Sequence, residues 1–275
     1  MRNLPFYFLL LFCACSVKKD TIKIKGSDTE VNLAVLLAEK FHGINDSLLI
    51  SVSGGGSGLG IASLLNGTAD IANSSRSINE DEIKLFTEKN IKLSSFIFAQ
   101  DAIAFVVSDK LPLDSLNTKD LAKILQGDYT NWSQVIKKAI PINIYGRQNN
   151  SGTHEFVKKI LQIHFSPHAK QMNGNAQILE AIKADNSGIG YVGAGYVMKG
   201  TTHGIKILKI FTDKSIAVSP LDEAKIASGA YFFQRPLFQY FKAMDYEKVK
   251  PFLDFEKTKI GVGIIHSAGY YPVKK

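Results

Sequence analysis

Three loops of this chain combine glycine with hydroxyl-bearing side chains directly before a predicted helix. They are residues 26–29, 54–58 and 146–153. The start of a helix presents unpaired backbone N–H groups and a partial positive charge, and glycine lets an oxyanion approach that backbone closely. In the third loop, Arg147 adds a planar guanidinium whose donors match the oxygens of a phosphate or a carboxylate. Three such helix starts would form an anion-binding site if they converged.

Each loop also has a purely structural interpretation. A Ser or Thr before a helix commonly serves as an N-cap, which contributes about 1 kcal/mol, and the three glycines at 54–56 would suit a flexible turn. The Ser-Gly-Thr segment at 151–153, preceded by Arg147, contains more than an N-cap requires, because one cap uses one hydroxyl and no arginine. A fourth loop could add the Ser75 hydroxyl and the Arg76 guanidinium, although arginines also commonly form surface salt bridges.

Other chemistries fail on composition or spacing. The only two cysteines lie within the first 15 residues, which leaves none in the body of the chain for a disulfide, a cysteine zinc site or a cysteine nucleophile. Leu59 stands where a dinucleotide fingerprint or a nucleophile elbow requires glycine. The six histidines lack metal-ligand spacing, and the lysines are too dispersed for a nucleic-acid surface despite a net charge of +8. We therefore expect no metal, no cofactor and no nucleic-acid partner.

The elements that must position the loops alternate apolar strands with amphipathic helices. Residues 21–25 alternate at period two, as a half-buried strand does, and residues 31–41 carry apolar side chains at helical spacing. The same patterns predict strands at 48–52, 69–72, 141–145 and 187–192, and helices at 59–66, 82–89, 118–125, 175–184, 246–255 and directly after Ser151. Strands separated by such helices predict a parallel sheet in an α/β fold, and a glycine-rich tail follows the last helix.

Two longer apolar stretches, residues 96–107 and 231–240, predict strands that carry the chain from one domain to another. The first is broken by Asp101 and the second contains Arg235. Two crossings imply two α/β lobes, the first of which is completed by the C-terminus. The expected units are lobe I at 15–103 and 232–275, lobe II at 104–231, and hinge segments near 99–107 and 229–236.

The N-terminus has the features of a secretory signal. Arg2 precedes an apolar run at residues 4–12, and Ala14 and Cys15 follow before the charged residues begin. The run is too short for a transmembrane helix, which needs about 20 apolar residues. Residues 1–14 are therefore a predicted signal peptide. A Cys directly after a small residue resembles the lipobox of bacterial lipoproteins, so Cys15 is the predicted lipidation site, with an ordinary secreted protein as the alternative.

At its polar loops the sequence resembles the phosphate-binding proteins that serve ABC transporters, within the class of two-lobed extracytoplasmic solute receptors. The matching stretches lie in family order over most of the chain after the signal, at 25–29, 56–61, 67–76, 146–153 and 189–192. The resemblance implies a two-lobed α/β fold of the type II periplasmic-binding-protein kind with two chain crossings. It also implies that hydroxyls, backbone N–H groups and one guanidinium bind phosphate, from Thr29, Ser57, Arg147, Ser151, Gly152 and Thr153.

The sequence departs from the family pattern at two positions. Many members carry Asp where this chain has Ser75, and that carboxylate accepts the proton of monohydrogen phosphate, which lets the site refuse sulfate. Members also carry Asp between the arginine and the Ser-Gly-Thr segment, where this chain has Asn149, so Arg147 is expected to lack its usual ion-pair partner. Our hypothesis is that Asp28 replaces the missing acceptor, while Ser75 and Arg76 add donors to the site.

The resemblance implies a binding protein and not an enzyme. We expect a monomeric lipoprotein, anchored to a membrane on its extracytoplasmic side (periplasm or cell surface), that captures inorganic phosphate between its lobes and delivers it to ABC permease subunits. Three alternatives stay open. They are a secreted phosphoesterase that uses Ser151 and His154, a phosphate sensor or adhesion component without a transporter, and another tetraoxyanion as the ligand.

Overall fold

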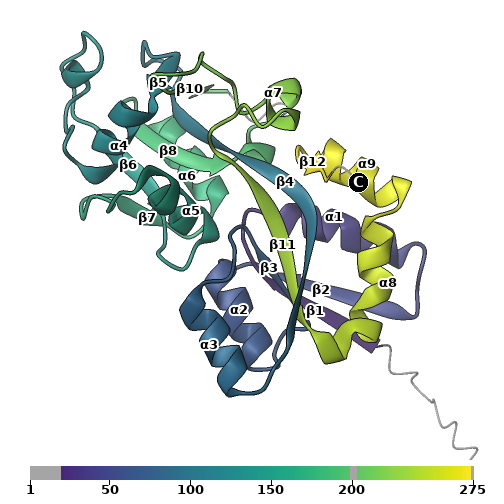
Figure 1. The fold of residues 1–275 in the computed structure, drawn as a ribbon. Helices are drawn as coiled ribbons and strands as arrows, with labels where there is room; N and C mark the ends of the chain where they lie inside the picture. Colours follow the sequence, from purple (N-terminus) through teal and green to yellow (C-terminus); the bar gives the residue numbers. More distant parts are fainter. Residues whose placement is uncertain (1–19, 199–202, 274–275) are drawn as a thin grey trace, which may run out of the picture.

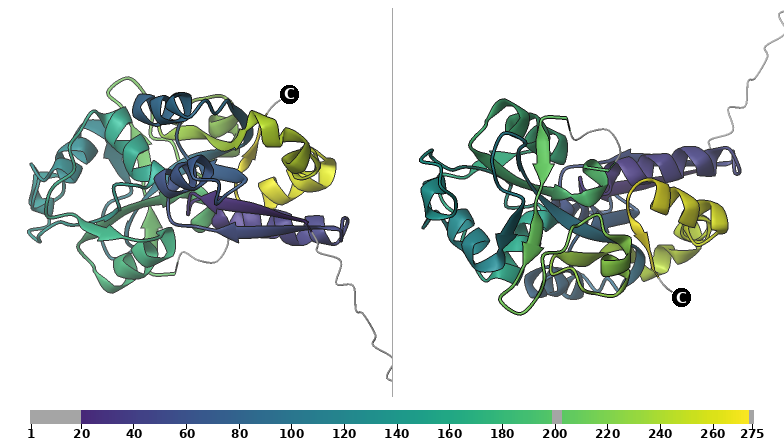
Figure 2. Two further views of the ribbon diagram at one scale, coloured as in Figure 1. Left: turned by 90° about the horizontal axis from the view of Figure 1, so that it is seen from below. Right: turned by 90° about the horizontal axis from the view of Figure 1, so that it is seen from above.

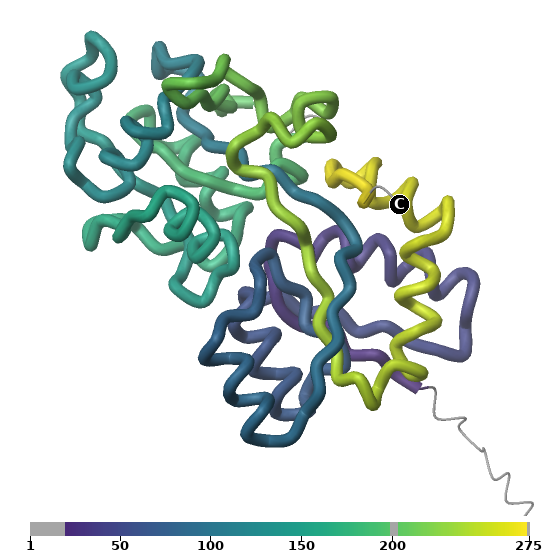
Figure 3. The backbone as a smooth tube through the Cα atoms, in the orientation of Figure 1, coloured from purple at the N-terminus to yellow at the C-terminus, as the bar shows by residue number. Residues whose placement is uncertain are grey.

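The computed structural model describes residues 20–198 and 203–273. The predicted signal peptide at 1–14 and the predicted lipidation site at Cys15 lie outside the described residues. Two bodies, lobe I and lobe II, are joined by two long strands that run side by side, β4 (Leu93–Ser108) and β11 (Gln234–Lys242) (Figure 1). Figure 3 follows both strands as continuous tubes from one lobe to the other. The two predicted crossings are therefore present.

Lobe I is built around the strand order β2-β1-β3-β11-β4. Parallel pairing joins β1 to β2 and β3, whereas β11 is antiparallel to both β3 and β4. The predicted parallel sheet is thus mixed, because the returning crossing strand enters it from the opposite direction. The remaining elements of lobe I are β1 (Asp20–Gly26), α1 (Val31–His42), β2 (Leu48–Ser53), α2 (Ser57–Leu65), β3 (Ile71–Ser74), α3 (Glu80–Glu88), η3 (Ala243–Asp245), α8 (Tyr246–Glu256), α9 (Lys259–Ser267) and β12 (Tyr271–Pro272).

Lobe II continues the same curled sheet through β4, β8, β6 and β7, and β9 also pairs with β4. A separate pair of short strands, β5 and β10, lies beside it. The elements of lobe II are β5 (Ser115–Asn117), α4 (Thr118–Gln126), η1 (Trp132–Gln134), β6 (Asn143–Arg147), α5 (Gly152–Leu161), β7 (Lys170–Met172), α6 (Asn175–Ala184), β8 (Gly188–Gly193), η2 (Ala194–Tyr196), β9 (Ile205–Ile207), β10 (Lys209–Phe211) and α7 (Glu223–Ala227).

Strand β4 belongs to both lobes because its partner changes along its length. Residues 93–102 pair with β11 in lobe I, and residues 103–107 pair with β8 in lobe II. Within lobe II its side chains alternate between two apolar cores, since Phe105 packs with α4 and α5 and Val106 packs with α6. A strand with both faces covered needs apolar residues at successive positions, which explains its long hydrophobic run.

In lobe I the two faces of the sheet are also covered by separate helices. Helices α1, α8 and α9 share one core, in which the rings of Phe41 and Phe252 meet edge to face at 5.4 Å. Helices α2 and α3 pack on the other face with Ala72 and Tyr240. Figure 2 shows the C-terminal helices packed on lobe I.

The predicted helices and strands are confirmed with small shifts of their ends, and α6 has the predicted bounds. The glycine-rich tail is wrong, because residues 259–267 form α9 and β12 then pairs with β4. Thr258 caps α9, and Gly261 is required where the helix start lies against the backbone of Phe255 and Glu256. Within residues 20–198 and 203–273, no helix is long and apolar enough to cross a membrane.

Candidate functional site

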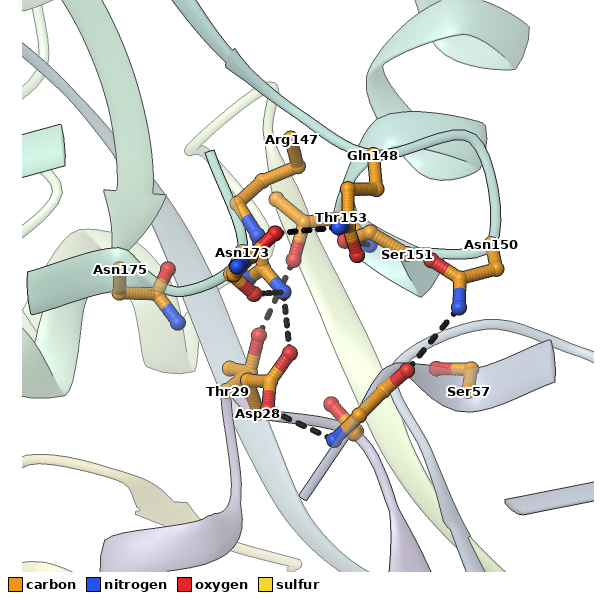
Figure 4. Close-up of polar contacts among 12 residues, drawn as sticks. Asp28, Thr29, Ser57, Arg147, Gln148, Asn150, Ser151, Thr153, Asn173 and Asn175 are labelled. Carbon is orange, nitrogen blue, oxygen red and sulfur yellow. Dashed lines mark hydrogen bonds and ion pairs between the residues drawn. The ribbon is translucent and has the colours of Figure 1, made fainter. Parts of the chain in front are cut away.

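Two predicted anion-binding loops, one from each lobe, meet between the lobes (Figure 4). Helix α2 begins at Ser57, and Gly56 before it has a φ of 95°, a conformation that favours glycine. Helix α5 begins at Gly152, and the hydroxyl oxygen of Ser151 accepts hydrogen bonds from the backbone N–H of Thr153 and His154. The Ser151 oxygen is therefore an N-cap, while its proton stays available for an anion.

The two helix starts approach each other closely at Gly152. A Cβ atom at this position would lie 2.6 Å from the hydroxyl oxygen of Ser75 and closer still to that of Ser57. Both serines are fully buried, and Ser57 Oγ accepts a hydrogen bond of 3.1 Å from the backbone N–H of Ser75. Ser75 Oγ in turn accepts one of 3.0 Å from Ser27. Glycine at 152 is thus required for the N-terminus of α5 to reach the hydroxyls of lobe I.

The backbone loops of the two lobes are also bonded to each other. The N–H of Gly58 donates to the carbonyl of Asn150 at 3.1 Å, and the side-chain amide of Asn150 donates to the carbonyl of Gly55 at 3.0 Å. These bonds join the 54–58 loop to the 146–153 loop. The structure is therefore in a closed arrangement, in which the lobes contact each other directly at the site.

A second interlobe contact lies between threonine hydroxyls. Thr29 Oγ1 in lobe I is 3.0 Å from Thr153 Oγ1 in lobe II, and both residues are buried. The backbone carbonyl of Thr29 accepts from the Tyr270 hydroxyl, and that of Asp28 accepts from Tyr196 at 2.7 Å. Tyrosines from both lobes therefore hold the 26–29 loop in place.

Arg147 and Asp28 form an ion pair across the cleft (Figure 4). Arg147 is 2% exposed, and its Nη2 also donates to the backbone carbonyl of Asn173 at 3.0 Å. Asp28 accepts a further bond of 2.8 Å from the backbone N–H of Gly55. Burial lowers the pKa of the Arg147 guanidinium, and the Asp28 carboxylate opposes this shift. Arg147 thus has an ion-pair partner, but that partner is Asp28 and not the usual residue at position 149.

The Arg147–Asp28 ion pair indicates a role for Asp28 that differs from the one predicted from the sequence. One of its carboxylate oxygens accepts from Arg147 and the other from Gly55. Asp28 takes the place of the ion-pair partner that Asn149 cannot supply, because an amide carries no charge. The hypothesis that Asp28 is the acceptor for a proton on the ligand gains no support from this geometry.

Buried donor atoms remain around the cluster. Within the described residues, Nε and Nη1 of Arg147 and Nη1 of Arg235 are shielded from solvent without a hydrogen-bond partner. Buried polar groups in proteins are nearly always paired, and guanidinium donors match the oxygens of a tetrahedral oxyanion. Together with the hydroxyls and helix starts, these atoms can bind a small, multiply charged oxyanion.

Arg76 lies apart from this cluster. Both of its terminal nitrogens bond Glu82 on α3, at 2.8 and 2.7 Å. Arg76 also lines a cleft of about 550 Å³ beside the cluster, as do Ser75 and Arg235. Of the predicted site residues, the structure brings together Asp28, Thr29, Ser57, Ser75, Arg147, Ser151, Gly152 and Thr153, and it leaves Arg76 paired elsewhere.

The hydrolase alternative requires a base beside Ser151, and His154 does not take that position. Its ring stacks on Phe165 with a centroid distance of 4.3 Å, and its Nδ1 lies 3.4 Å from the Tyr191 hydroxyl. Burial lowers the pKa of His154. The described residues also contain no group of three or more His, Cys, Asp or Glu side chains that could hold a metal ion.

The sequence interpretation did not assign Arg235 and Asp101 to the site. They are register partners on the two crossing strands and form a buried ion pair of 2.8 Å. From there, Arg235 Nη2 reaches Thr153 Oγ1 at 3.0 Å and Thr29 Oγ1 at 3.3 Å. A signal was present, since each residue is a charge within an otherwise apolar crossing strand. Two opposite charges buried in adjacent strands are expected to pair.

Two α/β lobes joined by two crossing strands, with polar loops of both lobes meeting between them, define a two-lobed binding protein of the periplasmic type. The family model of the PBP superfamily domain matches residues 16–256, and the chain belongs to this superfamily. Among curated relatives, the phosphate-binding protein PstS of Borreliella burgdorferi is 27% identical over 97% of this chain and 95% of its own length. A protein of the same name from Staphylococcus saprophyticus is 28% identical over 86% of this chain and 74% of its own length.

Solved structures show the same fold. An ABC-type phosphate transport receptor from Vibrio cholerae superposes with a TM-score of 0.73 and 27% identity, covering 92% of this chain and all of that one. A Clostridium perfringens structure, provisionally described as a phosphate ABC transporter substrate-binding protein with bound phosphate, gives a TM-score of 0.82 at 22% identity over 93% of this chain and all of its own. The predicted type II periplasmic-binding-protein fold is confirmed.

Proposed function

We propose that this chain captures inorganic phosphate between its lobes and delivers it to an ABC permease. The observation that carries the proposal is the convergence of the hydroxyls of Thr29 and Thr153, one from each lobe, beside the buried guanidinium of Arg147. Donors from both lobes suit a ligand that carries a negative charge and presents several oxygen acceptors. The names of the relatives and of the superposed structures support the same ligand.

The proposed ligand contacts come from groups with different roles. Arg147 supplies charge and paired donors, while the amides at the starts of α2 and α5 add helix-end donors. The hydroxyls belong to Thr29, Ser57, Ser75, Ser151 and Thr153, and Gly152 adds an unshielded amide. In this proposal Asp28 positions Arg147 and does not touch the ligand. No step requires a nucleophile, a metal or a cofactor, because capture and release break no covalent bond.

Closure over the ligand would occur by a hinge motion at the two crossings. The proposed lobes are residues 15–103 with 232–275, and residues 104–231. The change of partner along β4 between Ala102 and Ile103 supports a boundary near this point. A rotation here would separate the 54–58 loop from the 146–153 loop and open the site to solvent.

Calorimetric titration of the purified protein with phosphate, arsenate, sulfate and molybdate tests this function. We expect one site that binds phosphate and the isosteric arsenate, and a Thr153→Val variant that binds both more weakly. Failure of every tetraoxyanion to bind would refute the proposal. Turnover of a chromogenic phosphate ester would instead favour the phosphoesterase alternative.

We also propose that the protein is a monomeric lipoprotein held on the extracytoplasmic side of a membrane through Cys15. The apolar run before Cys15 supports this location, and so does the extracytoplasmic capture of phosphate in the proposed function. Radiolabelled palmitate should label the wild-type protein in its host and should not label a Cys15→Ser variant. Neighbouring permease and ATPase genes would support transport over a phosphate sensor or adhesion component.

A further inference from the structure

We infer that Arg235, held by Asp101, is a positioning residue that turns the paired hydroxyls of Thr29 and Thr153 into a donor for the ligand and couples their orientation to lobe closure. This inference rests on the proposed function, because it concerns how the same site holds its anion. Its evidence is independent of the helix starts, since it lies on the two crossing strands.

The ion pair has a fixed geometry. Arg235 and Asp101 face each other in register on β11 and β4 and are 2% and 0% exposed. Nε and Nη2 of Arg235 donate to the same Asp101 oxygen, at 3.1 and 2.8 Å. The ring of Phe156 on α5 lies 5.4 Å from Arg235 Cζ. The guanidinium plane is thereby fixed in one orientation, and so is the direction of its remaining donors.

The count of protons and lone pairs decides what the hydroxyls can do. Arg235 Nη2 carries two protons and faces three oxygens, one on Asp101 and one on each threonine. The two threonine oxygens therefore share its second proton as acceptors. An oxygen that already accepts from a cation has its own proton directed elsewhere, and the nearby positive charge strengthens it as a donor. The two threonine oxygens also lie 3.0 Å apart, so one hydroxyl donates to the other and the remaining proton is left for the ligand. Arg235 thus converts the ambivalent pair of hydroxyls into a donor.

The placement of the guanidinium couples this effect to closure. Thr29 belongs to lobe I and Thr153 to lobe II, while Arg235 lies on a strand that joins them. A rotation of the lobes moves the threonines apart, so one nitrogen can reach both only in the closed arrangement. Contacts that exist in one state alone shift the equilibrium towards that state. Arg235 therefore favours the closed form and orients the threonine donor of that form at the same time.

A solely structural role for the ion pair predicts a different set of results. In that case, removal of the guanidinium would lower stability without a specific effect on phosphate binding. Tyr231 offers a matched control, because its fully buried hydroxyl donates to the carbonyl of Ile103 at 2.6 Å beside the same crossing. Tyr231→Phe removes a buried hydrogen bond near the hinge and leaves both threonines unchanged.

The test is a double-mutant cycle on phosphate affinity, measured by calorimetry with the melting temperature of every variant. The variants are wild type, Arg235→Lys, Thr153→Val, the double variant, and Tyr231→Phe. We expect Arg235→Lys to weaken phosphate binding by about 10- to 100-fold, since the Nη2 group that reaches both threonines is lost. The double variant should lose little more than the weaker-binding single variant, because both changes remove the same donor. Tyr231→Phe should lower the melting temperature and leave the affinity unchanged.

Two results would overturn the inference while leaving the proposed function intact. One is an Arg235→Lys variant that binds phosphate as wild type does. The other is a double variant whose fold-loss equals the product of the two single losses, which means that Arg235 does not act through Thr153. If the wild-type protein binds no tetraoxyanion, the proposed function fails and the inference fails with it.

Discussion

The close contact between the two lobes at Gly152 offers a direct test of the closed arrangement. Replacement of Gly152 by Ala adds one methyl group at the start of α5, where it would lie 2.6 Å from Ser75 Oγ and closer to Ser57 Oγ. Ordinary contact between such atoms begins near about 3.5 Å. The lobes of the variant must therefore stay about 1 Å further apart at this point.

The cost of that separation follows from the bonds that cross the cleft. The Thr29–Thr153 contact of 3.0 Å and the Gly58–Asn150 bond of 3.1 Å would both lengthen beyond hydrogen-bonding range. Two such bonds contribute about 1 kcal/mol each, and one lost bond to a charged ligand contributes about 1.5 kcal/mol or more. The summed loss of about 3.5 kcal/mol in binding free energy predicts that phosphate affinity falls by roughly 100- to 1,000-fold.

The free protein should respond in the opposite direction. Alanine is a better helix former than glycine, so the open form of Gly152→Ala is expected to gain about 0.4–1 kcal/mol of stability. Gly263→Ala in α9 is the matched control, because nothing lies within 4 Å of a Cβ at that position. Calorimetry and thermal melting with and without phosphate measure both effects. Phosphate affinity within about twofold of wild type in Gly152→Ala would refute the closed arrangement as the bound state.

Three further predictions concern charged side chains. Asp28→Asn should leave the ratio of phosphate to sulfate affinity unchanged within about twofold, because Asp28 accepts from Arg147 and Gly55; a competition assay that shows a collapsed ratio would instead make Asp28 the acceptor of the ligand proton. Arg76→Gln should lower the free energy of urea unfolding by about 2 kcal/mol, because the ion pair with Glu82 is lost, and it should change phosphate affinity little. A large loss of phosphate affinity in a calorimetric titration would show that Arg76 belongs to the binding site. Burial raises the pKa of Glu256 to about 8 from an ordinary value of 4.5. The contribution of the Glu256 carboxyl to stability is present in full below pH 4.5 and is lost as the pH rises through about 8, with an upper limit of about 5 kcal/mol. In the Glu256→Gln variant, the free energy of urea unfolding should therefore depend less on pH across this range.

Local patterns in the sequence were sufficient to predict the secondary-structure elements and an anion-binding kind of site. Period-two and helical patterns located the strands and helices, since a half-buried strand or helix carries its apolar residues at the repeat of its own backbone. The hydroxyl- and glycine-rich loops before helices predicted an anion site, because that chemistry is local, and the family resemblance added Thr29, Ser57 and Thr153 as predicted donors. The tail at 259–267 was misread, since Gly261 serves close packing against α8 and Gly263 lies within the helix α9, so neither glycine marks a loop.

The pairing of the charged side chains depends on the packing of the whole fold. Asp28 and Arg147 are 119 residues apart, and Arg235 and Asp101 are 134 apart, so no local pattern could pair them. The pairing depends on lobe closure and on strand register, which are set by the packing of whole lobes. Because an unpaired buried charge is costly, the packing of the lobes pairs Asp28 with Arg147, and strand register pairs Asp101 with Arg235.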